Sequence, residues 1–314
     1  MGTERIRRVF RDATPRALRT IWWIFKITAG VSFAMFLLKY TGILTWVGTA
    51  VSPVFNLFGL PGDAALAYVS GYFINVYSCV AVVSTLELSA RELTIIGTMT
   101  LAAHSMVLEC AVQHKTGSPV AYIVILRTLA SLALGLLLNL ILPGRPDYSD
   151  ISALSLGDVP FFMIQGDFGV LFMSWLVGLA RLTVWMVCLI FLLNILQRIL
   201  YEYGVMKIIA KVFSPLLWVF GLDPSTSFMW IVANVAGLSY GSAAMLDEMQ
   251  RGGVRPFDLI LLNTHIGISH SNLEDLLLMS ALGGVWYVML LSRWAMAAVL
   301  VWSVRLLKPR RLLA

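Results

Sequence analysis

The second half of this 314-residue sequence repeats the first half. A shift of 162 positions pairs residues of distinctive chemistry, namely Arg19 with Arg181, Trp23 with Trp185, Gly42 with Gly204, Ser52-Pro53 with Ser214-Pro215, and Phe58-Gly59-Leu60 with Phe220-Gly221-Leu222. After a four-residue adjustment, a shift of 166 positions pairs a second set, namely Gly71 with Gly237, Glu92 with Asp258, Thr98 with Thr264, His104-Ser105 with His270-Ser271, Gly117 with Gly283, and Arg127 with Arg293. Apolar stretches match by chance at Leu and Val, but seldom at Trp, Pro, His and Arg. The sequence therefore predicts two copies of one structural unit.

Each copy contains four long apolar segments. They cover residues 20–38, 64–86, 93–113 and 120–142 in the first copy, and residues 171–196, 225–246, 258–281 and 285–304 in the second. Hydrophobic residues make up 59% of the chain and charged residues only 13%, whereas soluble domains carry about 25% charged residues. Such a chain cannot cover a water-exposed surface with polar groups, so we expect an integral membrane protein with the lipid bilayer as its solvent.

Positive charges gather at both ends of the chain. Residues 1–19 contain six arginines, and residues 305–314 contain Arg305, Lys308, Arg310 and Arg311 without any acidic residue. Basic residues next to membrane spans mark the cytoplasmic side, so we expect both termini in the cytoplasm and the chain in the inner (cytoplasmic) membrane. Because these residues flank apolar segments, they do not indicate a nucleic-acid partner.

The loops between the segments indicate how the two copies are oriented. If all eight segments crossed the membrane, the copies would be parallel and the acidic linker after residue 142 would be cytoplasmic, which the charge rule disfavours. If one segment per copy enters and returns on the same side, three spans remain and the copies are inverted. The second segments are the best candidates, because they are rich in Gly, Ser, Asn and Tyr. In that arrangement basic loops lie inside and their uncharged or acidic counterparts outside, as in His114-Lys115 against Ala281–Gly284, Gln197–Lys211 against Tyr40–Val51, and Met249–Phe257 against Leu86–Glu92.

The predicted fold class is an all-α integral membrane protein with two inverted repeats. Each repeat is expected to have about three spanning helices and one broken or re-entrant segment. The predicted organisation is a basic cytoplasmic N-terminus (1–19), a first repeat (20–142), an external linker (143–170), a second repeat (171–304) and a basic cytoplasmic tail (305–314).

Polar and ionisable residues are concentrated in the third segment of each copy, which we expect to form a helix. The candidates for binding a substrate there are His104, Ser105 and Glu109 in the first copy, and Asn263, Thr264, His270, Ser271, Asn272 and Glu274 in the second. Ionisable groups are costly inside a membrane and usually face a cavity or a partner. A structural alternative is that the histidines are buried core residues that duplication has kept in both copies.

Two further pairs of residues are candidates. Asn75 and Asn234 lie in the second segments, where broken backbone at membrane depth can contact a ligand, although close helix packing through small residues is an equal explanation. Arg127 and Arg293 lie inside the fourth segments. They either extend along the helix toward the membrane interface, or neutralise Glu109 or Glu274 as a gating ion pair.

Enzyme signatures do not occur in the sequence. It has no HExxH, no Walker A loop, no GxSxG and no GxGxxG before a helix, so we expect neither an enzyme nor an ATP-driven pump. Neither copy on its own has a dense His, Cys and carboxylate cluster, so we expect no metal ligands and no cofactor.

The two His-Ser motifs with a nearby glutamate, His104-Ser-Met-Val-Leu-Glu109 and His270-Ser-Asn-Leu-Glu274, carry a family resemblance. Together with the Gly- and Asn-bearing segments before them, they resemble the Gate, or nucleoside-recognition, family. That family includes spore maturation membrane proteins and the membrane core of ferrous iron transporters, and is distantly related to concentrative nucleoside transporters. The resemblance covers roughly residues 20–304 and implies a nucleoside-like substrate. Iron transporters of this group also bring a GTPase and cysteine motifs, which this chain lacks.

These observations favour a secondary transporter or gated pore for a small polar, nucleoside-like solute. Its site should lie between the inverted repeats, with H+ or Na+ as the coupling ion and a homo-oligomer as a further expectation. One alternative is a divalent-metal or proton pathway through the paired His and Glu residues. Another is a membrane scaffold or maturation factor that transports nothing.

Overall fold

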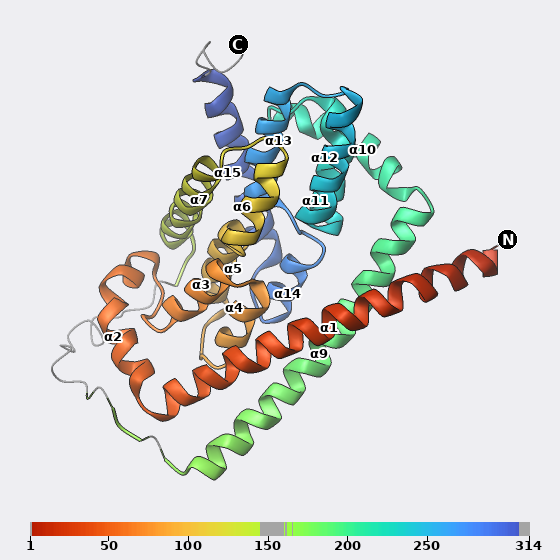
Figure 1. The fold of residues 1–314 in the computed structure, drawn as a ribbon. Helices are drawn as coiled ribbons and strands as arrows, with labels where there is room; N and C mark the ends of the chain where they lie inside the picture. Colours follow the sequence, from red (N-terminus) through yellow and green to blue (C-terminus); the bar gives the residue numbers. More distant parts are fainter. Residues whose placement is uncertain (1, 145–159, 161, 165, 308–314) are drawn as a thin grey trace.

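The computed structural model describes residues 2–144, 160, 162–164 and 166–307. Most of the expected linker and most of the basic tail, including Asp147, Asp150 and Lys308, lie outside these residues. Within them every regular element is a helix (Figure 1). The prediction of an all-α protein is therefore confirmed.

The two halves contain the same elements in the same order. The first half has α1 (Gly2–Tyr40), α2 (Ile43–Phe55), η1 (Asn56–Phe58), α3 (Ala64–Phe73), α4 (Val76–Val83), α5 (Ala90–Ala103), α6 (Met106–Lys115) and α7 (Val120–Ile141). The second has α9 (Phe168–Glu202), α10 (Val205–Val219), η2 (Pro224–Thr226), α11 (Ser227–Ala236), α12 (Leu238–Arg251), α13 (Pro256–Ser269), α14 (Asp275–Ala281) and α15 (Trp286–Leu306).

Repeated glycines are explained by the turns that they form. Gly42 and Gly204 precede α2 and α10 with φ of 74° and 68°. Gly59 and Gly221 have φ of 64° and 74°. Glycine adopts this left-handed backbone region without the steric penalty that a Cβ brings. The sequence matches at these positions therefore reflect the same chain turns in both halves.

Five helices are long and apolar enough to cross a membrane, namely Ile21–Tyr40, Ala90–Lys115, Val120–Ile141, Phe168–Glu202 and Trp286–Leu306. Many of their apolar side chains are exposed at the surface of the molecule, such as Leu140 on α7 and Val184 on α9. Exposed apolar side chains on long helices are stable only against lipid or another apolar surface. The chain is a multi-pass membrane protein.

Two stretches expected to be loops are helices. Residues 43–55 form α2, and residues 205–219 form α10, while α9 continues to Glu202. The buried residues of α2 are Leu44, Gly48, Ser52 and Phe55, a three-to-four residue spacing that is typical of an amphipathic helix. This spacing lies outside the long apolar runs from which the helices were predicted.

The second apolar segment is broken in both halves, as expected. The break between α3 and α4 lies at Ile74-Asn75, and the Asn75 side chain accepts a hydrogen bond from the Ser78 amide and so begins α4. The break between α11 and α12 lies at Gly237, with φ 91° and ψ 167°. Asn75 and Gly237 therefore occupy equivalent places.

The third apolar segment is also broken, which contradicts the prediction of a continuous helix. α5 ends at Ala103 and α6 begins at Met106, while α13 ends at Ser269 and α14 begins only at Asp275, so that His104 and His270 each follow a helix end. Glu274 therefore does not share a helix face with His270. The five-residue spacing of His104 and Glu109, which a regular helix does not place on one face, is accommodated by this break.

The hydrogen bonds also correct the sequence alignment. The Ser105 amide donates to the Gly71 carbonyl at 3.0 Å, and the Ser271 amide donates to the Ala233 carbonyl at 3.2 Å. Gly71 is therefore equivalent to Ala233 rather than to Gly237. The shift of 162 positions therefore holds through α3 and α11, and the change to a shift of 166 positions comes after these helices.

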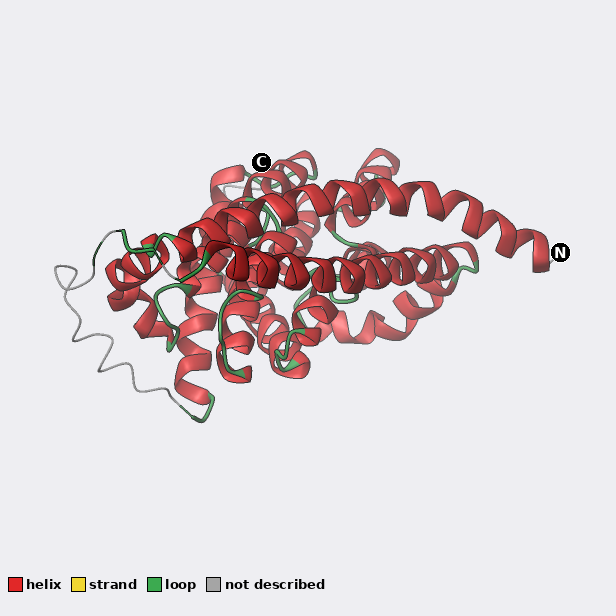
Figure 2. Ribbon diagram, turned by 90° about the horizontal axis from the view of Figure 1, so that it is seen from below, coloured by secondary structure: helices red, strands yellow, loops and turns green. Residues whose placement is uncertain are grey.

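Equivalent helices run in opposite directions in Figure 1. The chain passes upward from α5 to α6 but downward from α13 to α14, and α1 and α9 cross the same side of the bundle in opposite directions. Figure 2 also shows α1 and α9 side by side, where the Trp175 indole donates to the Ser32 hydroxyl at 3.0 Å. This reversal supports the inverted arrangement, which stays a proposal.

Candidate functional site

The breaks of the two halves meet at one cavity of about 200 Å³. We call it the seam cavity, because both repeats line it. Its polar and charged lining comes from α4, α6, α12 and α14 and from the breaks beside them, namely Asn75, Tyr77, His104, Ser105, Glu109, Ser239, His270, Ser271, Glu274 and Asp275. Residues 166 positions apart in the sequence thus face the same space.

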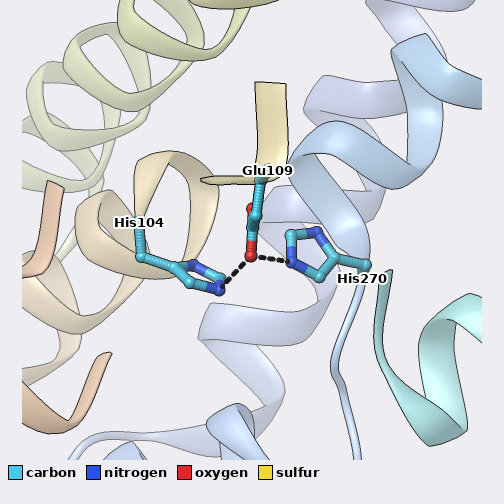
Figure 3. Close-up of side chains that lie close together, drawn as sticks. All are labelled: His104, Glu109 and His270. Atoms are coloured by element: carbon cyan, nitrogen blue, oxygen red, sulfur yellow. Dashed lines mark hydrogen bonds and ion pairs between the residues drawn. The ribbon is translucent and has the colours of Figure 1, made fainter. Parts of the chain in front are cut away.

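Glu109 lies at the centre of this lining, between two histidines (Figure 3). Its Oε1 atom is 3.0 Å from His104 Nε2 and 3.1 Å from His270 Nε2. The two imidazole rings approach from opposite repeats, with centroids 5.0 Å apart. All three residues are less than one tenth exposed. The expected convergence of the two His-Ser motifs is what the geometry shows, and their role in binding stays a proposal.

Backbone carbonyls fix the orientation of both imidazoles. Each histidine ends a helix, and its Nδ1 atom turns back to the carbonyl four residues earlier, at 3.3 Å for Thr100 and 2.7 Å for Ile266. A carbonyl oxygen only accepts hydrogen bonds, so Nδ1 carries the ring hydrogen in both residues. The Nε2 atoms are therefore the ones that point toward the cavity.

Arg127 is fully buried and reaches the same cluster. Its guanidinium lies 2.7 Å from Glu109 Oε2 and also donates to the carbonyls of Ala102 and His104, at 3.1 and 2.9 Å. The alternative in which Arg127 extends to the membrane interface is therefore wrong, and the Arg127–Glu109 ion pair is present. Arg127 on α7 thus places a positive charge inside the bundle, where it neutralises the Glu109 carboxylate at Oε2.

Arg293 occupies the equivalent place in the second repeat, but no ion pair joins it to Asp275, the acid 166 positions after Glu109. It donates to the carbonyls of Ile268 and His270, as Arg127 does to Ala102 and His104, and also to the Met289 carbonyl at 3.2 Å and to Asn272 Oδ1 at 2.6 Å. Glu274 instead accepts a hydrogen bond from the Tyr77 hydroxyl, across the seam. The proposed pairing of Arg293 with Glu274 is therefore not formed.

Two of the predicted residues lie away from the seam cavity. Asn263 donates to the hydroxyls of Thr116 and Ser118, both at 2.9 Å, and Thr264 contacts the Tyr122 hydroxyl at 2.7 Å. These bonds fasten α13 to the α6–α7 turn and to α7. Both residues therefore support the packing of the repeats. This is a structural role rather than a place in the lining of the seam cavity.

The asparagines of the second segments differ in position. Asn75 lines the cavity, and its buried Nδ2 atom has no hydrogen-bond partner among the described residues. Asn234 lies one contact behind, where its Oδ1 accepts from Asn272 at 2.6 Å. Asn272 in turn holds Arg293, so this pair orients the second break.

Sequence reasoning missed two residues of the site. Asp275 Oδ2 lies 3.3 Å from His104 Nε2, and Tyr77 contacts Glu274. Asp275 follows Glu274 directly, but a continuous helix would have turned it away from the cavity. Only the break after His270 allows both acids to face the seam, and the sequence carries no Gly or Pro there to signal it.

Comparison with known proteins gives a family for the first half of the chain. Residues 21–138 match the Gate family, described as nucleoside recognition. Over 308 residues the chain is 26% identical to the "Uncharacterized membrane protein YvoD" of Bacillus subtilis (strain 168), covering 95% of each chain. No solved structure matches significantly. The matched span contains His104, Ser105, Glu109 and Arg127, so these residues of the seam lie in a stretch that is similar to the Gate family.

Proposed function

We propose that this protein is a secondary transporter or gated pore for a small polar solute of the nucleoside class, and that the seam cavity is its solute site. The observation that carries the proposal is a cavity whose ionisable lining is mostly buried and comes equally from the two repeats. Secondary transporters built from repeats with broken helices bind solutes at such interfaces. The Gate match supplies the nucleoside class.

The lining suits the polar edges of a nucleoside. Glu109 and Asp275 accept hydrogen bonds from hydroxyl or amino groups, while the free Nδ2 of Asn75 donates to a carbonyl or ring nitrogen. A buried donor without a partner is costly, so a ligand acceptor at Asn75 would remove that cost.

We propose that two larger hollows form the routes to the cavity, one in each repeat. One of about 700 Å³ lies between α1, α4 and the start of α9, and one of about 740 Å³ lies between the end of α9, α11 and α12. They occupy equivalent places in the two repeats, since Ser32 and Asn194, like Ala81 and Ala243, are 162 positions apart. Alternate opening of these hollows would expose the cavity to each side in turn. The Tyr77–Glu274 contact between the repeats would break as the repeats move.

The proposed orientation in the membrane follows from the basic residues at both ends of the chain. We place both basic termini in the cytoplasm, the chain in the inner membrane, and the driving force in a gradient of H+ or Na+. We keep a scaffold without transport as the second function, because the seam contacts would also stabilise a rigid assembly.

Ligand-dependent thermal unfolding tests the solute class. We expect nucleosides at saturating concentration to raise the melting temperature of the detergent-purified chain, since a ligand that binds only the folded state stabilises it by mass action. His270→Ala should lose this stabilisation, whereas Asp247→Asn, on the exposed face of α12, should keep it. The panel includes nucleobases and is run with and without EDTA. No response of the wild-type protein to any solute would favour the scaffold.

A further inference from the structure

The hydrogen-bond pattern around His270 requires positive charge at its Nε2 atom. Both ring nitrogens face oxygen atoms, the Ile266 carbonyl at 2.7 Å and Glu109 Oε1 at 3.1 Å. A neutral imidazole has only one N–H, and the carbonyl takes it. The Nε2 lone pair therefore points at a carboxylate oxygen, which also carries only lone pairs.

His104 repeats this pattern from the other repeat. Its Nδ1 faces the Thr100 carbonyl at 3.3 Å, while its Nε2 lies 3.0 Å from the same Glu109 Oε1 and 3.3 Å from Asp275 Oδ2. Three ligand atoms, two imidazole nitrogens and one carboxylate oxygen, converge within 4.8 Å of one another (Figure 3). Buried lone pairs that face each other without a cation or a proton between them are strongly unfavourable.

Two protons or one divalent metal ion could supply the missing charge, and the surroundings of the cluster favour the metal. The two contacts of 3.0 and 3.1 Å lie within the range of N–H···O hydrogen bonds. Ligands held tetrahedrally about 2.0–2.2 Å from one ion lie about 3.3–3.6 Å apart, so small shifts of the side chains would admit an ion.

The surroundings of the cluster match those of metal ligands. Metal-binding histidines usually donate the other ring N–H to a carbonyl, and ligating carboxylates are themselves held by hydrogen bonds. The carbonyls of Thr100 and Ile266 do the first, and Arg127 holds Glu109 Oε2 in an ion pair at 2.7 Å. The Oε1 atom is thereby left for the ion.

We infer that His104, Glu109 and His270 form a binding site for a divalent first-row transition-metal ion, which joins the two repeats at the seam. Two imidazoles and one carboxylate suit Zn²⁺, Co²⁺ and similar ions, whereas Mg²⁺ and Ca²⁺ prefer oxygen ligands. Metal ligands were not predicted from the sequence, because neither copy alone contains the full ligand set. Binding of the ion does not depend on solute transport, so this inference goes beyond the proposed function.

Zinc binding to the full chain tests the inference. The protein is purified in detergent, stripped with EDTA and titrated with ZnCl₂, and bound zinc is measured by mass spectrometry after desalting. We expect about one zinc per chain, an affinity at least about 100-fold lower in Glu109→Gln and His270→Gln, and no change in His114→Gln, whose imidazole lies at the end of α6 away from the cluster. MgCl₂ should not compete.

Two results would overturn the site: a wild-type chain that binds no zinc, or variants that bind zinc like the wild type. Melting curves without metal show whether each variant folds. If Glu109→Gln does not fold, the metal site is tested instead by zinc binding to His270→Gln and by the visible spectrum of the Co²⁺-loaded wild-type protein. If the wild-type chain binds no zinc but nucleosides still raise its melting temperature in EDTA, only the metal site is ruled out. If the chain binds zinc but no nucleoside raises its melting temperature, only the proposed function is ruled out.

Discussion

Replacing Arg127 with methionine is expected to lower the free energy of unfolding by about 3–5 kcal/mol, because it leaves the buried Glu109 carboxylate without its ion pair. The same change frees the carbonyls of Ala102 and His104, which have lost their helix partners at the break. Methionine has a similar length and keeps the apolar part of the packing. Denaturant unfolding in mixed micelles measures the difference.

Arg293→Met is the matched control for this prediction. Arg293 is equally buried but contacts carbonyls and Asn272 rather than a carboxylate. Its removal leaves no acid in direct contact unpaired, so the loss should be smaller. A double replacement, Arg127→Met with Glu109→Leu, should recover part of the stability. Equal losses at Arg127 and Arg293 would show that the ion pair contributes nothing beyond the carbonyl bonds.

A valine at position 105 is expected to destabilise the protein by about 1–3 kcal/mol through backbone strain. Ser105 has φ 47°, in the left-handed region, where a β-branched side chain is strongly disfavoured. The chain turns there between His104 and Glu109, so the substitution should also disturb the seam cavity. Thermal unfolding with and without nucleoside measures both effects.

Ser105→Gly separates the backbone from the side chain. Glycine tolerates this conformation, and the serine hydroxyl makes no capping bond to α6, so this variant should melt close to the wild type. Ser271, with φ 57°, should respond in the same direction. If valine and glycine had equal effects at position 105, the break would not depend on the left-handed turn.

The sequence predicted the duplication, the apolar segments and the break in the second segment of each copy. These features depend on local composition and on spacing within one copy. The meeting of His104 and His270 was also predictable, because a motif that is repeated in inverted copies tends to face its counterpart at the interface.

What could not be predicted depends on partners distant in the sequence. The break after His270 carries no Gly or Pro, and its turn is held by amide bonds to Ala233 and Asn234 on another helix. The choice between a buried and an interfacial Arg127 was settled only by the position of Glu109. Likewise, the two-histidine cluster exists only when both copies are folded together, so neither copy alone indicated a metal ligand set.

Uptake of labelled nucleoside into proteoliposomes tests the central claim, that solute crosses the membrane through the seam between the repeats. The account predicts saturable uptake by the wild-type protein that falls at least about tenfold in Glu109→Gln, because the uncharged amide removes the carboxylate that pairs with Arg127 and faces both histidines in the seam cavity. Glu87→Gln, exposed between α4 and α5 and outside the lining of the seam cavity and of both hollows, should transport like the wild type. Saturable uptake that is unchanged in a folded Glu109→Gln variant would contradict it, and so would the absence of uptake by the wild-type protein.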